Sequence, residues 1–169
     1  MTTESRFAPS TDTKKFRIAL GRFATGITVI TTITPQGPIG ITANSFASIS
    51  LEPALVMWSP AKASSRHDIF VAADAFAVHV LSSDQKAVCD AFIRRKDAFE
   101  EIAYTPNQDG VPLIAGCLAV FECRRSTTYS AGDHTIILGE VYAAFERAGD
   151  SLIFSNGEFS SLQQTASAA

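Results

Sequence analysis

The part of the sequence with the most chemical capacity is GITANSFASISLEP, between Gly40 and Pro53. Its small polar members are Thr42, Asn44, Ser45 and Ser48. Small side chains allow a flat ring to approach the backbone, and hydroxyl, amide and main-chain N–H groups can hydrogen-bond the ring's polar edge. The same pattern also fits an ordinary edge strand that ends in a polar bulge.

A second candidate site is expected at Ser64 and Ser65, which can cap a short helix that runs through Val71. Free N–H groups and the dipole at the start of a helix favour a phosphate. Lys62 and Arg66 add positive charge to this segment. A plain helix cap beside two surface cations is the alternative interpretation.

The third candidate is His134, which follows Gly132 and Asp133 at the expected mouth of a hairpin. Loops at such places carry binding groups more often than cores do. Asp133 can either orient the imidazole ring or cap the turn. A structural role is the alternative for the histidine, since most lone histidines are structural.

Several other chemistries have no matching pattern. The sequence contains no phosphate-binding P-loop, no dinucleotide G-x-G-x-x-G after a strand and no G-x-S-x-G nucleophile elbow. Ser65, His67 and Asp68 are too close in sequence for a hydrolytic triad, because neighbours on one short helix point to different faces. The histidines also lack the spacing of metal ligands, so no metal site is expected.

Length and composition predict one domain of 169 residues with no basic excess, at a net charge of −3. Nucleic acid is therefore not an expected partner. Three cysteines without a C-x-x-C pair indicate reduced thiols. We find neither a signal peptide nor an apolar run of about 18 residues that could span a bilayer. We expect a cytoplasmic protein without a membrane partner.

The elements that must position these groups are mostly strands. Besides the short helix through Val71, we expect a helix from Phe16 to Phe23, begun by Asp12 or Thr13 and ended by Gly26. A third helix is expected over 84–94, opened by a capping box of Ser82 and Gln85. The expected strands are 27–34, 39–50, 54–59 (buried on both sides), 76–81, 117–129, 134–147 and 152–155, the first two forming a hairpin. Residues 1–12 and 163–169 are expected to be loose ends of a domain over 13–162. The fold class is mainly β with short helices, an antiparallel barrel.

The sequence resembles the flavin reductase family, which has the FMN-binding split-barrel fold and supplies the reductase components of two-component flavin monooxygenases. Blocks in the family's order carry the resemblance: FRIALGRFATGITVITT at 16–32, GITANSFASISLEP at 40–53, SPAKASS at 59–65, FAVHVL at 76–81, and GDH at 132–134 before IILGEV at 136–141. The family often has a double proline where this chain has Glu52-Pro53-Ala54, a difference that involves no contacting group.

The resemblance implies roles for particular residues. Residues 42–45 would line the isoalloxazine ring with support from Ser48, residues 59–65 would wrap the ribityl chain and phosphate, and His134 would seat the nicotinamide. Arg94 or Lys96 could take the phosphate role in place of Arg95, and Phe159 would come from the second subunit. The expected cofactor-binding residues are Thr42, Ala43, Asn44, Ser45, Ser48, Ser59, Lys62, Ala63, Ser64, Ser65, Arg66, Phe92, Arg95, Phe99, Gly132, Asp133 and Phe159, with His134 as the expected catalytic residue.

The reaction that the resemblance implies is hydride transfer from NADH or NADPH to non-covalent FMN or FAD. It implies a homodimer that passes reduced flavin to a partner monooxygenase. A non-catalytic FMN-binding or shuttle protein of the same fold is one alternative. A pyridoxamine-phosphate oxidase is another, although the basic residues for a second phosphate site are missing. A purely structural dimer leaves the polar strand unexplained. The sequence does not separate FMN from FAD or NADH from NADPH.

Overall fold

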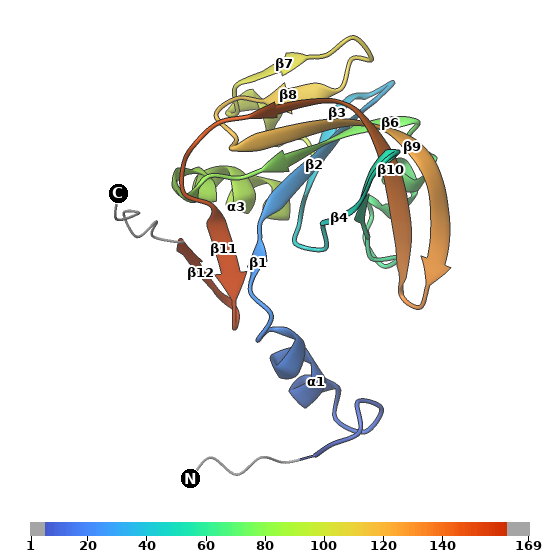
Figure 1. Ribbon diagram of the computed structural model, residues 1–169, viewed down its shortest axis with the longest axis vertical. Helices are drawn as coiled ribbons and strands as arrows, with labels where there is room; N and C mark the ends of the chain where they lie inside the picture. Colours follow the sequence, from blue (N-terminus) through green and yellow to red (C-terminus); the bar gives the residue numbers. More distant parts are fainter. Residues whose placement is uncertain (1–5, 162–169) are drawn as a thin grey trace.

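The computed structural model describes residues 6–161 as a curved β-structure with short helices (Figure 1). In chain order the elements are α1 (Thr13–Leu20), β1 (Thr25–Gly26), β2 (Thr28–Thr34), β3 (Gly37–Ala43), β4 (Ala47–Leu51), β5 (Ala54–Trp58), α2 (His67–Ala72), β6 (Ala75–Val80), η1 (Ser83–Gln85), α3 (Lys86–Arg94), η2 (Ala98–Glu100), β7 (Tyr104–Pro106), β8 (Pro112–Ile114), β9 (Ala119–Ala131), β10 (His134–Glu146), β11 (Leu152–Ser155) and β12 (Glu158–Ser161). The expected tail 163–169 lies outside the described residues. None of the described helices is long and apolar enough to cross a membrane.

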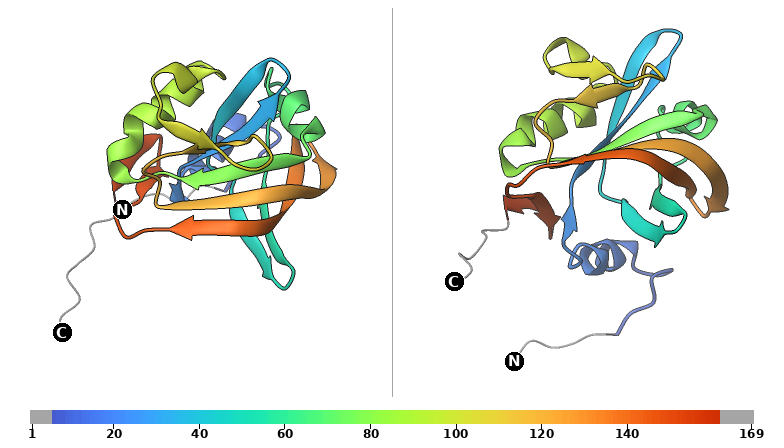
Figure 2. Two further views of the ribbon diagram at one scale, coloured as in Figure 1. Left: turned by 90° about the horizontal axis from the view of Figure 1, so that it is seen from above. Right: turned by 45° about the horizontal axis from the view of Figure 1, so that its top comes forward.

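The main sheet has seven strands in the order β3-β2-β6-β9-β10-β5-β4, and its paired strands are antiparallel. Its two edge strands, β3 and β4, are consecutive in the chain and are joined by residues 44–46. The sheet therefore curls until its edges come near one another without forming a ladder (Figure 2). This confirms the predicted antiparallel split-barrel class, with a barrel that stays open between β3 and β4.

The centre of the sheet is built from β2, whose sequence TVITTIT is rich in β-branched residues that favour a strand. Thr28, Thr31 and Thr32 are buried there, and each hydroxyl donates to a main-chain carbonyl at 2.7–2.8 Å. These bonds satisfy the polar groups that the strand carries into the core. Strand β2 can therefore be buried along most of its length.

Apolar side chains form a core on each face of the sheet, because successive residues of a strand point to opposite faces. One cluster includes Val29 and packs under α3, where Phe92 is fully buried. The other includes Ile30 and surrounds Trp58 and Phe70, whose ring centroids are 5.0 Å apart. The curved sheet thus has support from both sides.

Several expected boundaries differ from the structure. Asp12 caps α1 as predicted, but the helix ends at Leu20 rather than near Gly26, because β1 pairs with β11 and holds Thr25–Gly26 extended. The expected strand 39–50 is two strands, and strand 54–59 buries chiefly one face. The sequence did not predict the hairpin β7–β8 or strand β12.

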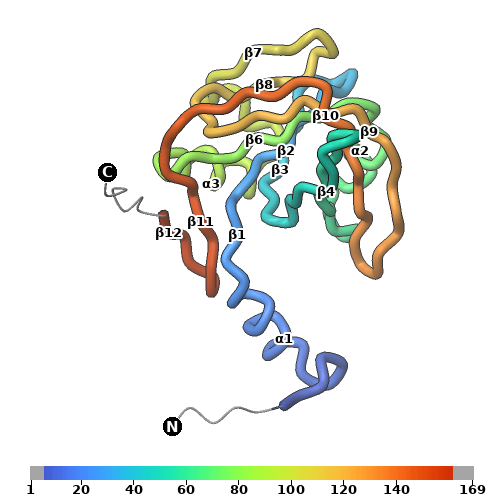
Figure 3. The backbone as a smooth tube through the Cα atoms, viewed as in Figure 1, coloured from blue at the N-terminus to red at the C-terminus, as the bar shows by residue number. Residues whose placement is uncertain are grey.

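Helix α1 stands apart from the main sheet beyond β1, as the backbone trace shows (Figure 3). It has no buried residue, and Phe16, Leu20 and the following Phe23 are 40%, 57% and 78% exposed. The capping box of Ser82 and Gln85 is present as predicted, although it opens η1, which precedes α3.

Candidate functional site

The open edge of β3 is the first part of the site. Gly40 N–H donates to Lys96 O at 2.7 Å, so this N–H points away from the paired strand β2. Main-chain groups two residues apart in a strand point the same way, which directs the N–H of Thr42 off the sheet edge as well. The Thr42 hydroxyl donates to Cys89 O at 2.8 Å and ties the strand to α3.

Ser45 holds the linker between the two sheet edges. Its hydroxyl accepts a hydrogen bond from Ser59 N–H at 3.0 Å and donates to Ser59 O at 3.2 Å. Both bonds fasten residues 44–46 to the end of β5. Asn44, in contrast, is exposed, and its amide makes no hydrogen bond among residues 6–161. The free polar groups of the segment are therefore the Asn44 amide and the edge N–H of Thr42.

A cavity of about 210 Å³ lies at this edge. It is lined by Ile27, Thr42, Ala43, Asn44, Cys89, Ile93, Phe154 and Phe159. The two phenylalanines come from the β11–β12 hairpin, with ring centroids 5.2 Å apart. Phe159 thus lines this cavity together with Asn44 of its own chain, whereas the family resemblance implies a Phe159 supplied by the second subunit.

The loop 59–66 packs against the tip of the β9–β10 hairpin. Lys62 Nζ donates to Ser130 Oγ at 2.8 Å and to Gly132 O at 2.7 Å, and Lys62 N–H donates to Asp133 O at 2.8 Å. Ala61 forms an isolated bridge with His134. The structure therefore brings the expected phosphate loop and the G-D-H tripeptide together. The ammonium group of Lys62, expected to add charge for a phosphate, is held by the hairpin.

Ser64 and Ser65 do not cap a helix, contrary to expectation. Helix α2 begins at His67 with Arg66 as its N-cap residue, and no side chain makes a capping bond. Ser64 instead forms a turn, with its N–H donating to Ala61 O at 2.9 Å and its hydroxyl accepting from Arg66 N–H at 3.2 Å. Ser64 therefore does not stand at a helix N-terminus, and the predicted dipole for a phosphate is absent there.

Arg66 joins the loop to the sheet edge. Its guanidinium group donates to the carbonyls of Gly40, Phe92 and Ile93. Burial lowers the pKa of Arg66, and the nearby carboxylate of Asp97 opposes this shift. The positive charge predicted for a phosphate is thus engaged with carbonyl oxygens of β3 and of the last turn of α3.

His134 lies on the exposed side of the same hairpin tip. Its Nδ1 is 2.8 Å from Asp133 Oδ1, and its side chain is 42% exposed. The hydrogen bond and charge of His134 lower the pKa of Asp133. Asp133 therefore orients the imidazole, one of the two roles considered for it, while Nε2 makes no hydrogen bond within the described chain.

The aromatic residues expected beside the ring lie in the core. Phe92 is fully buried, so its ring offers no surface to a ligand, and it packs against Phe99 at 4.9 Å between centroids. Arg95 is exposed and lies 3.8 Å from carboxylate oxygens of both Asp97 and Glu100. Phe92 can therefore act only by supporting Gly40, against which its ring packs.

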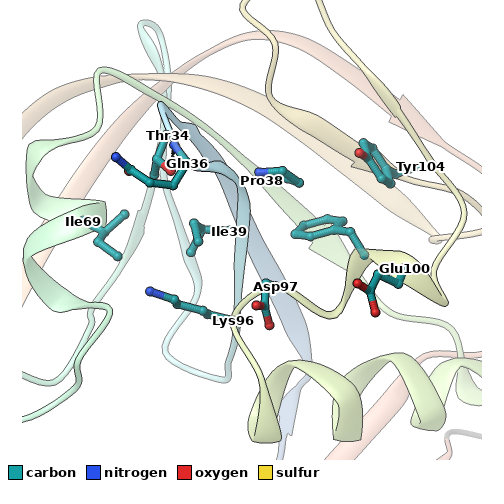
Figure 4. A pocket seen from close by; sticks show the side chains of 10 residues that line it. Thr34, Gln36, Pro38, Ile39, Ile69, Lys96, Asp97, Glu100 and Tyr104 are labelled. Carbon is teal, nitrogen blue, oxygen red and sulfur yellow. Dashed lines mark hydrogen bonds between the residues drawn. The ribbon is translucent and has the colours of Figure 1, made fainter.

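A larger cavity of about 510 Å³, which no sequence pattern predicts, lies farther along β3 (Figure 4). It lies between the β2–β3 turn, α2 and the segment that follows α3. Phe99 and Lys96 line this cavity, whereas Ile93 lines the smaller one. Phe99 and Lys96, both expected near the flavin, thus lie together at this larger cavity and not at the smaller one.

The site as a whole suits a flat ring with one polar edge. The smaller cavity offers apolar side chains for the faces of such a ring, and the free groups of Thr42 and Asn44 can bind its edge. Ser48 is exposed on β4, and Ala63 and Ser65 are exposed on the neighbouring loop. A flavin fits this donor set better than a metal does, since no group of His, Cys, Asp and Glu within the described chain could hold a metal ion.

Comparison with known proteins gives the same family. The profile described as "Flavin reductase like domain" matches residues 20–163. The protein "FMN reductase (NADH) SmoA" of Agrobacterium fabrum is 54% identical over 160 residues, which cover 94% of this chain and 92% of that protein. The "Flavin-dependent monooxygenase, reductase subunit HsaB" of Rhodococcus jostii is 35% identical over 158 residues, covering 92% of this chain and 81% of that protein.

Solved structures agree with this assignment. The "NADH:FAD oxidoreductase SgcE6" of Streptomyces globisporus C-1027, in complex with NAD and FAD fragments, has a TM-score of 0.89 and 37% identity, covering 96% of this chain and 99% of that chain. Profile, sequence and fold agree over nearly the whole chain, and the resemblance seen in the motifs is confirmed. The chain belongs to the flavin reductase family.

Proposed function

We propose that this chain transfers a hydride from NADH to FMN or FAD, held without a covalent bond at the edge of β3, and that the reduced flavin passes to a partner monooxygenase. The observation that carries the proposal is the convergence of three segments: the 42–45 edge, the 59–66 loop and the 132–134 hairpin tip. Ser45 joins the first to the end of β5, and Lys62 joins the loop to the hairpin. The names of the FMN reductase and HsaB relatives support the reaction and the kind of partner.

A bound flavin supplies the ring that accepts the hydride, so the chain needs no strong acid or base. The protein contributes binding and orientation, which lower the entropic part of the barrier. The edge N–H of Thr42 and the amide of Asn44 bind the polar edge of the ring. Phe159 covers the ring, and Lys86 Nζ, 4.6 Å from the Phe159 ring centroid, steadies that cover. His134, oriented by Asp133, seats the nicotinamide.

His134→Ala tests this assignment. The variant loses one hydrogen bond to the nicotinamide, which is worth about 0.5–1.5 kcal/mol, so KM for NADH should rise about 2- to 13-fold. The Kd for FMN should stay unchanged, since His134 is not placed on the flavin. The measurement is steady-state NADH oxidation at 340 nm together with flavin fluorescence, and His134→Gln serves as the variant that keeps a polar group. Unchanged NADH kinetics in His134→Ala would make the residue structural.

The same assay separates a reductase from a non-catalytic flavin carrier. Wild-type protein that binds FMN but does not oxidise NADH or NADPH in the presence of free flavin would be a carrier. NADPH is included because the proposal leaves the preference between the two nicotinamide donors to this measurement.

We also propose that the protein is a homodimer whose second copy covers α1. A helix whose apolar residues Phe16, Leu20 and Phe23 are exposed gains stability when another surface buries them. Leu20→Glu should convert a dimer into a monomer in light scattering, and a wild-type monomer would refute the proposal. The three free cysteines are buried, which is compatible with the cytoplasmic location that we propose.

A further inference from the structure

The larger cavity is not used by the proposed hydride transfer. Figure 4 shows Ile69 and Tyr104 on opposite sides of it, with Ile39 and Pro38 between them. Tyr104 is 38% exposed, and its ring centroid lies 5.0 Å from that of Phe99. A flat apolar surface with an accessible aromatic ring is suited to an aromatic heterocycle.

The rim of this cavity is polar. Lys96 is exposed and makes no ion pair among the described residues. Asp97 and Glu100 are only loosely paired with Arg95, at 3.8 Å each, so their carboxylates can still accept hydrogen bonds. The rim therefore offers a cation and hydrogen-bond acceptors around an aromatic surface.

An adenosine 5′-phosphate group matches these features. Its base is flat and can stack on Tyr104, its ribose hydroxyls can donate to Asp97 or Glu100, and its phosphate can pair with Lys96. The lining carries one basic side chain, Lys96, and two acidic ones, Asp97 and Glu100, so a bare phosphate ion gains little there. Binding must depend on the base as well as the phosphate.

The cavity is also placed where a cofactor bound at the β3 edge can reach it. Ile39 lines the larger cavity and Thr42 the smaller one, and three residues of a strand span about 10 Å. The end of α3 runs in the same direction, because Ile93 lines the smaller cavity and Lys96, just after the helix, lines the larger one. Arg66 lies between the two, bound to the carbonyls of Gly40 and Ile93.

We propose that the cavity lined by Ile39, Ile69, Lys96 and Tyr104 binds the adenosine-phosphate end of a dinucleotide whose other end lies at the β3 edge. The inference rests on the proposed function, which places a flavin and a nicotinamide at that edge. Both FAD and NADH carry such an end, and FMN does not. The cavity would thereby favour ligands that carry the adenosine-phosphate end, a preference that the flavin ring alone cannot give.

The test compares ligands with and without the adenylate, in variants of the cavity. Base stacking on an aromatic side chain is worth a factor of about 5 to 150 in affinity. If FAD is the source, wild type should bind FAD more tightly than FMN by about this factor, and Tyr104→Ala should abolish the difference without changing the Kd for FMN. Ile69→Trp, which fills the cavity from the opposite side, should have the same effect. Tyr129→Ala, at an exposed tyrosine of the β9–β10 hairpin, is the matched control.

If NADH is the source, the two cavity variants should raise KM for NADH and leave KM for reduced nicotinamide mononucleotide unchanged. Cavity variants with the wild-type Kd values for FAD and FMN and the wild-type KM for NADH would refute the adenylate site. Equal losses for all three ligands would also refute it, because they would indicate a general distortion. Wild type that binds neither FMN nor FAD would refute the proposed function itself, a different result from wild type that binds both flavins and shows no adenylate effect.

Discussion

Replacing Gly40 by alanine should destabilise the protein through a single contact. A Cβ atom at this position would lie 2.4 Å from Cε1 and 2.5 Å from Cδ1 of the Phe92 ring. Phe92 is fully buried against Phe99, so the ring has little room to move away. Overpacking of this kind costs about 1–3 kcal/mol. The reduced entropy of the unfolded alanine chain offsets about 0.4–1 kcal/mol of that.

The expected net loss is about 1–2 kcal/mol, which corresponds to a fall in Tm of about 2–8 °C for a domain of this size. The only tryptophan, Trp58, is fully buried, so its fluorescence can follow urea and thermal unfolding. Flavin affinity should fall as well, because Arg66 bridges the carbonyls of Gly40 and Phe92 and a displaced ring would separate them.

Gly26→Ala is the matched control, since a Cβ there meets nothing within 4 Å. It should leave stability within about 0.5 kcal/mol of wild type. Phe92→Leu in the Gly40→Ala background should recover part of the loss, with a coupling energy of about 0.5–3 kcal/mol. A Gly40→Ala variant with the Tm of Gly26→Ala, or a double variant without coupling, would contradict a clash between the Cβ atom and Phe92.

Three further predictions concern titration, thiols and the hairpin tip. Burial lowers the pKa of His79 from 6.5 to about 4, so the neutral core histidine should contribute stability above pH 6.5 that is lost as pH falls toward 4. The loss is about 3 kcal/mol by linkage, and unfolding curves of wild type and His79→Leu from pH 7 to 4 should diverge; parallel curves would contradict this. Burial also raises the pKa of Cys117 to about 11 and of Cys123 to about 12, so neither thiol should react with an aromatic disulfide reagent at pH 8 until the protein unfolds. His67 Nε2 lies 2.8 Å from the hydroxyl of Thr135, the residue that follows His134. Thr135→Val should therefore loosen His134 and raise KM for NADH by a few fold, and Thr135→Ser should restore the wild-type KM. An effect on the Kd for FMN instead would place this contact at the flavin.

Local interactions were predictable from the sequence. The β-branched run of β2, the hairpin with β3, the helix cap at Asp12 and the capping box of Ser82 and Gln85 depend on residues a few positions apart, and they are present. The short strands β7, β8 and β12 were missed because they are only three or four residues long and become strands through pairing with a partner. The break of 39–50 into two strands depends on the curl of the whole sheet, which no local pattern records.

The sequence also predicted which kinds of residues form the site, and the order of its motifs indicated the family. The structure decided which of these groups are free to bind. Thr42 donates to a residue 47 positions away, Lys62 to one 70 positions away and Arg66 to one 26 positions away. A side chain gives its hydrogen bonds to whichever partner folding brings nearest, and that partner lies far off in the sequence. For this reason the sequence determined the chemistry available at the β3 edge. The tertiary structure determined that Asn44 and the main chain of Thr42, rather than Lys62 and Arg66, are left there to bind a ligand.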